Sequence, residues 1–388
     1  MRMNPYPKGT LRVAMIGHRF MGAAHSQAWR TAPRFFDLPA DIQMSVIVGR
    51  DPIAAADAAA RLGWREVATD WREVVARDDI DIVDICVPSD LHAPIALAAL
   101  SAGKHVLCEK PLSNTVDEAV AMAEAAAEAR QVGVQALLGF TYRRVPAIQL
   151  ARSIVARGDL GEIRQTRATY LQDWLADPSA PMSWRLDRSV AGSGALGDLG
   201  SHAVDAIQFI TDQHVTCVAG ALRTFVPTRP WPQGRDDESA EGQVTVDDAA
   251  VFVAEMSGGT LATFEATRMA TGRKNHLRLE VNGSWGSLLF DLEDLNSLWV
   301  YDGRAGSDAG FRRILVTEPT HPYVGAWWPP GHGLGYEHAF SHQVVDFVNA
   351  ICTGDAVAPD FSDGLQVQRV LEAVERSVDS KGWEAVMS

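Results

Sequence analysis

The sequence of 388 residues lacks most features of secreted, membrane-bound or nucleic-acid-binding proteins. No apolar run approaches the roughly 18 residues of a membrane span, and no apolar signal segment follows the charged N-terminus. A formal net charge of -14 repels nucleic-acid phosphates and anionic membranes. The few cysteines are spaced neither for a disulfide framework nor for a zinc site; they are Cys86, Cys108, Cys217 and Cys352. We therefore expect a cytoplasmic protein that binds a small molecule, with no nucleic-acid partner, no membrane partner and no metal.

The composition is that of a globular protein with a sizeable core. Apolar residues make up 47% of the chain and charged residues 22%. The chain is too long for one ordinary core, and about 150 residues per domain gives two to three units. Because the pattern changes near residue 140, we predict two domains, 1–139 and 140–388.

The first domain shows the alternation of strands and helices that is typical of a parallel sheet. Short apolar runs occur at 11–16, 44–48, 82–87, 105–108 and 134–139. Ala-rich helical patterns lie between the later runs, with glycines as helix stops. This order predicts an α/β Rossmann domain, a doubly wound parallel sheet that binds a dinucleotide.

The second domain has longer stretches in which apolar and polar residues alternate, at 163–170, 249–255, 260–267 and 277–281. The alternation predicts an α+β domain with a mostly antiparallel sheet covered on one face. Two irregular segments stand out. We expect 227–241 to be a mobile surface loop. The other, 318–335, carries aromatic residues that can present flat faces to sugar rings; they are Tyr323, Trp327 and Trp328.

A candidate phosphate-binding turn follows the first strand and opens a helix. A pyrophosphate would bind there to backbone N–H groups at the positive end of the helix dipole. The middle glycine of the G-x-G-x-x-G fingerprint is Arg19 here, so the motif alone is equally compatible with a plain strand-to-helix turn. The residues expected at the pyrophosphate are Gly17, Arg19, Phe20, Met21 and Gly22.

The end of the second strand bears on the choice between NAD and NADP. An acidic residue there usually holds the adenosine ribose, but this chain has Gly49 and Arg50. Asp51 is better explained as the N-cap of a helix that begins at Pro52. Arg50 is either a solvated residue or a partner for a 2′-phosphate. We predict NAD or NADP as cofactor, with NADP used at least comparably.

Lys110 is the first candidate for proton transfer. It lies in Glu109-Lys110-Pro111 at the carboxyl end of a predicted strand, the edge where α/β sheets bind ligands. Pro111 keeps Lys110 extended, so the side chain has a defined direction and can exchange a proton with a substrate hydroxyl. Taken alone, a surface lysine would be the simpler interpretation.

Asp198 and His202 form a second candidate set. If 198–210 is helical, the two side chains stand four residues apart on one helix face. An aspartate beside a histidine fixes its tautomer and favours its protonated form, as a proton relay requires. The alternative is an N-cap aspartate followed by a helix histidine with a structural partner.

His338 and His342 share the same helical spacing. The H-E-x-x-H pattern is absent and no third ligand is evident, so metal binding is not favoured. We interpret the pair as part of a partly exposed helix in the second domain.

Taken in order, the motifs resemble those of the Gfo/Idh/MocA oxidoreductase family. The motifs are Gly17 to Gly22 with Ala24-His25, Pro88-Ser89-Asp90-Leu91-His92, Glu109-Lys110-Pro111, Tyr142-Arg143, Ser183-Trp184-Arg185 and Gly197 to His202. The resemblance covers nearly the whole chain. It implies a Rossmann domain followed by a domain with a large open sheet, which in family members often mediates dimers or tetramers.

The resemblance also implies roles for single residues. Lys110 and His202 would handle the hydroxyl proton, and Asp198 would orient His202. The nicotinamide half of the cofactor would be lined by Pro88, Ser89, Leu91, His92, Glu109 and Lys110, with Arg185 near both nicotinamide and substrate. The residues expected at the substrate are Lys110, Tyr142, Trp174, Arg185, Asp198, His202 and Tyr336.

We therefore predict an NAD(P)-dependent dehydrogenase or reductase. It would move a hydride between nicotinamide and a secondary alcohol or ketone carbon of a sugar, anhydrosugar or cyclitol, as a homodimer or homotetramer. Two alternatives remain open. One is a glycosidase of the same superfamily that retains its cofactor and oxidises the sugar only transiently. The other is a sugar or nucleotide sensor without catalysis, which would have no need of a proton-transfer set.

Overall fold

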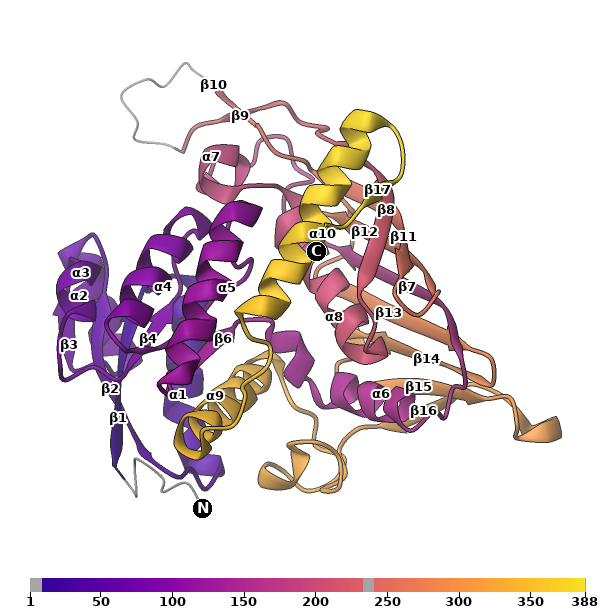
Figure 1. Cartoon of the computed structure of the whole chain (residues 1–388), viewed down its shortest axis with the longest axis horizontal. Helices are drawn as coiled ribbons and strands as arrows, with labels where there is room; N and C mark the ends of the chain where they lie inside the picture. Colours follow the sequence, from indigo (N-terminus) through magenta and orange to yellow (C-terminus); the bar gives the residue numbers. More distant parts are fainter. Residues whose placement is uncertain (1–8, 233–240, 388) are drawn as a thin grey trace. The chain divides into compact units, whose positions relative to one another are not determined.

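The computed structural model describes residues 9–232 and 241–387, which divide into two compact units. Unit 1 contains the described residues up to Arg144 together with Gly335–Leu365. Unit 2 contains Val145–Leu334 and the described residues from Gln366 onward. Figure 1 labels their helices and strands. Within the described ranges, no helix has the length and apolar character needed to cross a membrane.

Unit 1 is built on a six-stranded parallel sheet with the order β3-β2-β1-β4-β5-β6. This order confirms the predicted Rossmann fold and places the topological switch point between β1 and β4, where such sheets bind dinucleotides. The strands are β1 (Thr10–Ile16), β2 (Asp41–Val48), β3 (Glu66–Ala68), β4 (Ile82–Ile85), β5 (His105–Cys108) and β6 (Ala136–Leu138).

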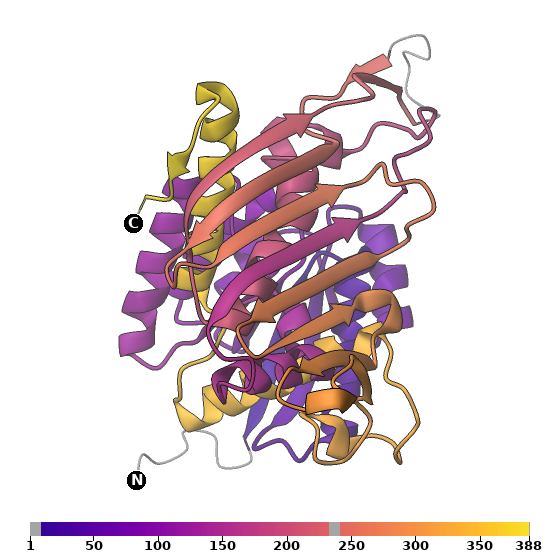
Figure 2. The same ribbon diagram turned by 90° about the vertical axis from the view of Figure 1, so that its right-hand side faces the viewer.

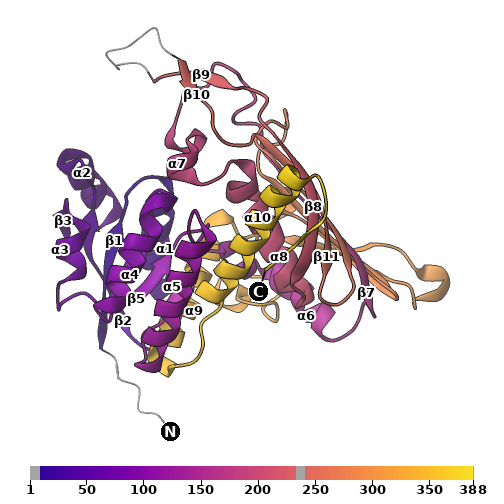
Figure 3. The same ribbon diagram turned by 45° about the horizontal axis from the view of Figure 1, so that its top comes forward.

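The helices that connect these strands begin where the sequence provides caps. Asp51 accepts hydrogen bonds from the N–H groups of Ile53 and Ala54, so its predicted role as an N-cap is confirmed. Helices α4 and α5 pack against each other (Figure 3). The connecting helices are α1 (Phe20–Phe35), α2 (Pro52–Leu62), α3 (Trp71–Val75), α4 (His92–Ser101) and α5 (Val116–Gln131).

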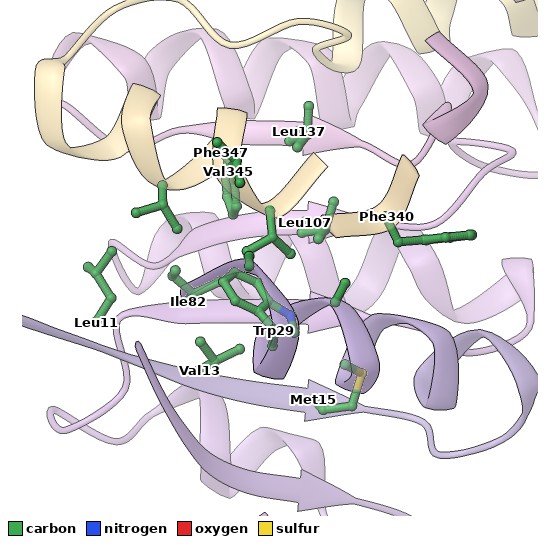
Figure 4. Close-up of a cluster of buried hydrophobic side chains, with 14 of the residues drawn as sticks. Leu11, Val13, Met15, Trp29, Ile82, Leu107, Leu137, Phe340, Val345 and Phe347 are labelled. Carbon is green, nitrogen blue, oxygen red and sulfur yellow. The ribbon is translucent and has the colours of Figure 1, made fainter. Parts of the chain in front are cut away.

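Helix α9 (Tyr336–Thr353) belongs to unit 1 although it lies nearly 200 residues beyond β6. It packs against α1, and Phe340 and Phe347 join Trp29 in one buried cluster (Figure 4). The predicted boundary assigned everything after residue 139 to the second domain. The structure instead ends the first segment of unit 1 at Arg144 and adds 335–365, because the apolar face of α9 is buried on α1.

The two histidines of α9 belong to unit 1, so their predicted place in the second domain is wrong, while the helix is partly exposed as predicted. His342 is fully buried, and its Nδ1 lies 2.9 Å from the carbonyl oxygen of Arg144. Desolvation lowers the pKa of His342 to about 3, so the ring is neutral and donates to that carbonyl. The Nδ1 of His338 accepts the N–H of Gly335, 3.0 Å away. Both histidines therefore have structural partners within unit 1.

Unit 2 contains a nine-stranded mixed sheet with the order β16-β15-β14-β13-β7-β12-β11-β8-β17. Only the pair β7 and β12 is parallel, so the predicted mostly antiparallel sheet is confirmed. The strands are β7 (Ile163–Leu171), β8 (Val215–Arg223), β11 (Ala249–Met256), β12 (Leu261–Thr267), β13 (His276–Gly283), β14 (Gly286–Asp291), β15 (Ser297–Asp302), β16 (Arg312–Leu315) and β17 (Glu384–Ala385).

Helices cover one face of this sheet, and Figure 2 looks onto the opposite face. α8 packs against β7, β12 and β13, and α6 packs against β14 and β15. The helices of unit 2 are α6 (Pro146–Ala156), α7 (Arg188–Ala191) and α8 (Ser201–Thr211), and α10 (Phe361–Ser380) begins in unit 1 and continues into unit 2.

The two irregular segments contain local structure. Thr228–Pro230 (β9) pairs with Glu241–Gln243 (β10), so the ends of the predicted loop 227–241 form a short hairpin ladder. Residues 233–240, the rest of that loop, lie outside the described residues. In the second segment, the rings of Trp327 and Trp328 have centroids 6.3 Å apart, and Trp328 is exposed.

Candidate active site

The turn between β1 and α1 is tight because two glycines contact backbone. Gly17 has a φ of +101°, and a Cβ there would lie 2.2 Å from the carbonyl oxygen of Cys86. A Cβ on Gly22 would lie 2.2 Å from the carbonyl oxygen of Gly17. Arg19, by contrast, is the N-cap of α1 with a φ of -75°, a conformation open to any side chain. The turn therefore accommodates the departure from the glycine fingerprint.

The N-terminus of α1 fits the pyrophosphate of a dinucleotide. The helix is 16 residues long, and its first turn contains no acidic residue, so the positive end of its dipole is not neutralised by a carboxylate. It begins directly after β1, beside the switch point of the sheet. Phe20, in the first turn, stacks on Tyr336 with ring centroids 6.3 Å apart. The residues present thus fit the group that this fold binds.

The ring of His18 lies beside Gly49 at the end of β2, where this fold usually discriminates NAD from NADP. A Cβ on Gly49 would lie 2.5 Å from Cδ2 of His18, so a side chain there would require the His18 ring to move. Arg50 is exposed beside it. Burial raises the pKa of the Asp90 carboxyl, and the charge of Arg50 partly offsets that shift. Arg50 and Asp90 therefore lie within electrostatic reach of each other.

Lys110 follows β5 between two residues whose positions are fixed by hydrogen bonds. Glu109 is buried, and its Oε1 lies 3.0 Å from Nε2 of His25. The other oxygen, Oε2, accepts the N–H of Lys110 at 3.3 Å. Lys110 itself is half-buried. The main chain on its N-terminal side is thus held by a carboxylate that has its own buried partner.

His92 holds the other side of Lys110. Its Nδ1 lies 2.8 Å from the carbonyl oxygen of Pro111, and its Nε2 lies 3.1 Å from that of Val87. Desolvation lowers the pKa of His92, so we take the ring as neutral, with the shorter contact as the hydrogen bond. Both nitrogens of His92 therefore face main-chain carbonyls, one on each side of the ring.

In unit 2, Asp198 lies in a π-helical turn that leads directly into α8. The turn covers Leu196–Gly200, and the N–H of Ser201 donates to the carbonyl of Leu196, five residues earlier. The predicted helix is therefore present, with its first turn wider than an α-helical turn. Such turns are rare and occur often at functional sites. His202 follows in the first turn of α8.

Asp247 fixes the start of the π-helical turn. Its carboxylate accepts the N–H groups of Gly194 and Leu196 at 2.7 and 2.8 Å. A Cβ on Gly194 would lie 1.8 Å from the carbonyl oxygen of Asp247, so only glycine fits there. The backbone that presents Asp198 is therefore clamped by a neighbouring strand end.

Two arginines accompany Asp198. Nη2 of Arg268, a fully buried side chain, donates to Oδ2 of Asp198 at 3.1 Å and to the carbonyl oxygen of Gly194 at 2.9 Å. The guanidinium of Arg185 stacks on Trp184, 4.4 Å from the ring centroid. Desolvation lowers the pKa of Arg185, while the charge of Asp198 opposes the shift. One carboxylate thus faces two cations.

His202 lies at one end of a line of polar and aromatic side chains. Its ring makes an edge contact with Tyr170, 5.9 Å between centroids. The Tyr170 hydroxyl donates to Oδ1 of Asn275 at 2.7 Å, and Gln172 donates to the same oxygen at 2.8 Å. Trp174, 42% exposed, donates its indole N–H to Gln172 at 2.9 Å. Hydroxyl, amide and indole groups of this kind suit a polyhydroxylated ligand.

The structure places the expected site residues in two groups. Lys110, Tyr142 and Tyr336 belong to unit 1, where the rings of Tyr142 and Tyr336 meet edge to face with centroids 6.4 Å apart. Asp198 and His202 belong to unit 2. The remaining expected substrate residues, also in unit 2, are Trp174 and Arg185.

Sequence reasoning missed several residues of these groups. In unit 2 the missed residues include Arg268 and Asn275, whose positions after β12 and before β13 carried no recognisable motif. In unit 1 the missed group centres on His25, which was part of a motif but had no assigned partner, and on Asp84 in the middle of a buried strand. A charged residue inside an apolar strand was the available signal, because such residues are rarely buried without a partner.

Both units match known sequence families. Residues 11–136 match the family described as oxidoreductase family, NAD-binding Rossmann fold, and residues 148–289 match the GFO/IDH/MocA C-terminal domain. Levoglucosan dehydrogenase from Pseudarthrobacter phenanthrenivorans is 40% identical over 383 residues, which are 96% of this chain and 97% of the relative. The chain belongs to the Gfo/Idh/MocA oxidoreductase family. It is therefore an NAD-binding oxidoreductase, which confirms the predicted enzyme class.

Solved structures of Gfo/Idh/MocA proteins agree with this fold over the whole chain. An oxidoreductase domain protein from Kribbella flavida is 60% identical with a TM-score of 0.95, covering 98% of this chain and 100% of that one. Levoglucosan dehydrogenase in complex with NADH and levoglucosan is 39% identical with a TM-score of 0.93 at the same coverage.

Proposed function

We propose that this chain is a dehydrogenase for a secondary alcohol of a sugar, anhydrosugar or cyclitol, and that levoglucosan is the first substrate to test. The observation that carries the proposal is the similarity to levoglucosan dehydrogenase, which extends over 96% of the chain. A levoglucosan dehydrogenase has been solved in complex with NADH and levoglucosan, at a TM-score of 0.93 to this chain.

The polar groups of unit 2 support a sugar ligand. Asp198 and His202 supply a carboxylate and an imidazole on successive turns, and Trp174 supplies a partly exposed aromatic face. Sugars bind to proteins through such combinations of hydrogen-bonding groups and flat apolar rings. The neighbouring Gln172 and Asn275 are held by their own hydrogen bonds, so the surface is ordered before a ligand arrives.

In the proposed reaction, the residues of this chain move the proton and orient the substrate. Bound NAD supplies the hydride acceptor. We assign the proton of the reacting hydroxyl to Lys110 and His202, as the family resemblance implies. Asp198, held by Arg268, orients His202 and stabilises its protonated form. Gly17, Gly22 and the N-terminus of α1 bind the pyrophosphate.

The test is a panel of levoglucosan, monosaccharides and inositols with NAD and NADP, followed by absorbance of the reduced nicotinamide. Sustained formation of reduced cofactor with one substrate supports the proposal. Product release without net reduction would instead identify the glycosidase that retains its cofactor. Sugar binding without any turnover would identify the sensor. Either result would overturn the proposal.

We also propose that the open face of the large sheet joins two copies of the chain, in the cytoplasm. Large apolar side chains on strands of this face are exposed, among them Val251, Leu261 and Trp299. Exposed apolar side chains on a sheet face that the helices leave open are candidate contacts for a second copy of the chain. All four cysteines are free, which is consistent with a reducing compartment. Light scattering of the wild type and of Val251→Glu tests the assembly, and a monomeric wild type would contradict it.

A further inference from the structure

His25 lies between two buried carboxylates in unit 1. Its Nδ1 is 2.9 and 3.0 Å from the two oxygens of Asp84, in strand β4. Its Nε2 is 3.0 Å from Oε1 of Glu109, which follows β5. His25 itself lies in the second turn of α1, the helix that opens the dinucleotide turn. The relative exposure of the three residues is 1%, 0% and 4%.

Each ring nitrogen of His25 faces a carboxylate oxygen. When both carboxylates are ionised they only accept hydrogen bonds, so both ring nitrogens donate and the ring is an imidazolium. Although desolvation alone lowers it, the charge and hydrogen bond of Asp84 hold the pKa of His25 well above its usual value. Cys86 and Cys108 are further titratable neighbours, and burial raises the pKa of both thiols. From α9, the residue that faces His25 is Phe340, 5.4 Å between ring centroids.

Asp84 has further hydrogen-bond partners besides His25, and they hold the Asp84 end of the network in place. Its Oδ2 accepts the indole N–H of Trp29 at 2.7 Å, and Oδ1 lies 3.6 Å from the Cys86 thiol. At the other end of the network, Glu109 accepts the N–H of Lys110 with its second oxygen, which connects the network to Lys110. Gly139 leaves the room that this carboxylate needs, since a Cβ there would lie 2.7 Å from Oε1 of Glu109.

We propose that His25 is a positioning residue for Lys110: its imidazolium ties Glu109 to Asp84 and so fixes the main chain from which the Lys110 side chain projects. The proposal rests on the proposed function in one respect, the proton-transfer role of Lys110. His25 touches no reacting atom, and it acts through Glu109. A neutral His92 holds the carbonyl of Pro111, so the lysine is fixed from both sides by histidines of different charge.

A metal ion is the competing explanation for this cluster, because His25, Asp84 and Cys86 are all possible ligands. The distances favour a proton on His25, shared in a hydrogen bond with Asp84, over a bound metal ion. His25 Nδ1 lies 2.9 Å from Asp84, which is a hydrogen-bond length, whereas two ligands about 2.1 Å from one tetrahedral zinc ion would stand about 3.4 Å apart.

The first experiment needs no turnover. Side-chain ¹⁵N NMR of the full-length protein follows the histidine rings from about pH 6 to about pH 9. We expect one buried ring to remain doubly protonated at about pH 8.5, to vanish in His25→Gln and to persist in His105→Gln, a matched loss of another buried histidine of unit 1. If His25→Gln does not fold, His276→Gln is measured instead, because His276 also faces two carboxylates. A doubly protonated ring that persists in His276→Gln is then assigned to His25. A neutral His25 at about pH 7.5, or stoichiometric bound metal in elemental analysis, would overturn the proposal.

The second experiment measures the link to Lys110. In His25→Gln, Asp84 and Glu109 face each other without a cation, so Glu109 should titrate and move. We expect kcat to fall at least about tenfold with KM nearly unchanged, and the pH profile of kcat to gain a new ionisation between about pH 6 and pH 8. His105→Gln should keep the wild-type profile. An unchanged profile in His25→Gln would refute the positioning role. If the wild type oxidises no sugar at all, the proposed function fails, and the NMR result still decides the charge of His25.

Discussion

Arg268 donates a hydrogen bond to Asp198 across 3.1 Å, and the same nitrogen donates to the carbonyl oxygen of Gly194. The arginine is buried, whereas the side chain of Asp198 is 28% exposed. A buried cation thus fixes a carboxylate that still faces solvent. This relationship joins the end of β12 to the π-helical turn, and neither residue type nor spacing indicated it.

Arg268→Lys tests that relationship. Lysine keeps the charge but cannot reach the carboxylate and the carbonyl with one planar group, so Asp198 should lose its fixed orientation. We expect kcat/KM for the sugar to fall by about 10- to 100-fold, with NAD affinity little changed. Arg167→Lys, an exposed arginine on β7, is the matched control and should behave as wild type. Equal activity in both variants would contradict the role of Arg268.

Lys110→Met tests the main proton-transfer assignment. Removal of an acid or base typically costs about two to four orders of magnitude in kcat, and we expect cofactor affinity to stay nearly intact. NADH titration by fluorescence should give a wild-type dissociation constant. Lys381→Met, which removes an exposed lysine of unit 2, should leave both quantities unchanged. Full activity of Lys110→Met would remove this residue from the mechanism.

Asp198 and His202 are predicted to act as a unit. Asp198→Asn should shift the pH optimum, because the amide cannot stabilise a protonated imidazole. The double variant with His202→Ala should cost much less than the sum of the two single losses, as expected for residues of one relay. The measurement is kcat for all four proteins across pH. Purely additive losses would show that the two side chains act independently.

We predict that Arg50 influences the choice between NAD and NADP. We expect NADP to be used at least comparably to NAD, since no carboxylate stands at position 49 and a guanidinium is exposed next to it. Arg50→Gln should lower kcat/KM for NADP by about tenfold or more and leave that for NAD nearly unchanged. Gly49→Asp is a poor test, because its Cβ would meet His18. A wild type that strongly prefers NAD, with no response to Arg50→Gln, would contradict the expectation.

Acid should destabilise unit 1 through two neutral histidines. Burial lowers the pKa of His105 to about 4 and that of His342 to about 3. Below about pH 6.5 the unfolded chain binds protons at these residues that the folded chain does not, so stability is full above about pH 6.5 and decreases as the pH falls. The slope is about 1.4 kcal/mol per pH unit for each histidine within this window.

Thermal unfolding at about pH 7.5 and about pH 5.5 measures this dependence. His342→Gln should be less stable at both values, but its Tm should decrease less between them. An equal decrease in wild type and variant would show that other groups control the acid response.

The fold could be predicted where the sequence pattern is local. The strands of the Rossmann sheet and the cap at Asp51 follow from apolar runs and turn residues, and both are present. The place of α9 could not be predicted, because an amphipathic helix does not specify which distant surface will cover it. Only the contact with Trp29 on α1 decides it.

The candidate site shows the same division. Gly17, Lys110 and His202 stand in motifs with a chemical meaning, so they could be named in advance. Arg268 could not, because its importance comes from a contact across 70 residues of chain. The network of His25 likewise depends on separations of 59 and 84 residues.

Because α9 packs back against α1, the two chain segments of the nucleotide-binding unit leave the ribosome at different times. The apolar surface around Trp29 emerges early, and its cover, Phe340 and Phe347, emerges only after all but the last part of unit 2 has been made. Until then this apolar surface of the nascent chain is exposed and can associate with other chains. A protein cut short before Gly335 would keep that surface for its whole lifetime, and we expect it to aggregate rather than to persist as a free Rossmann domain.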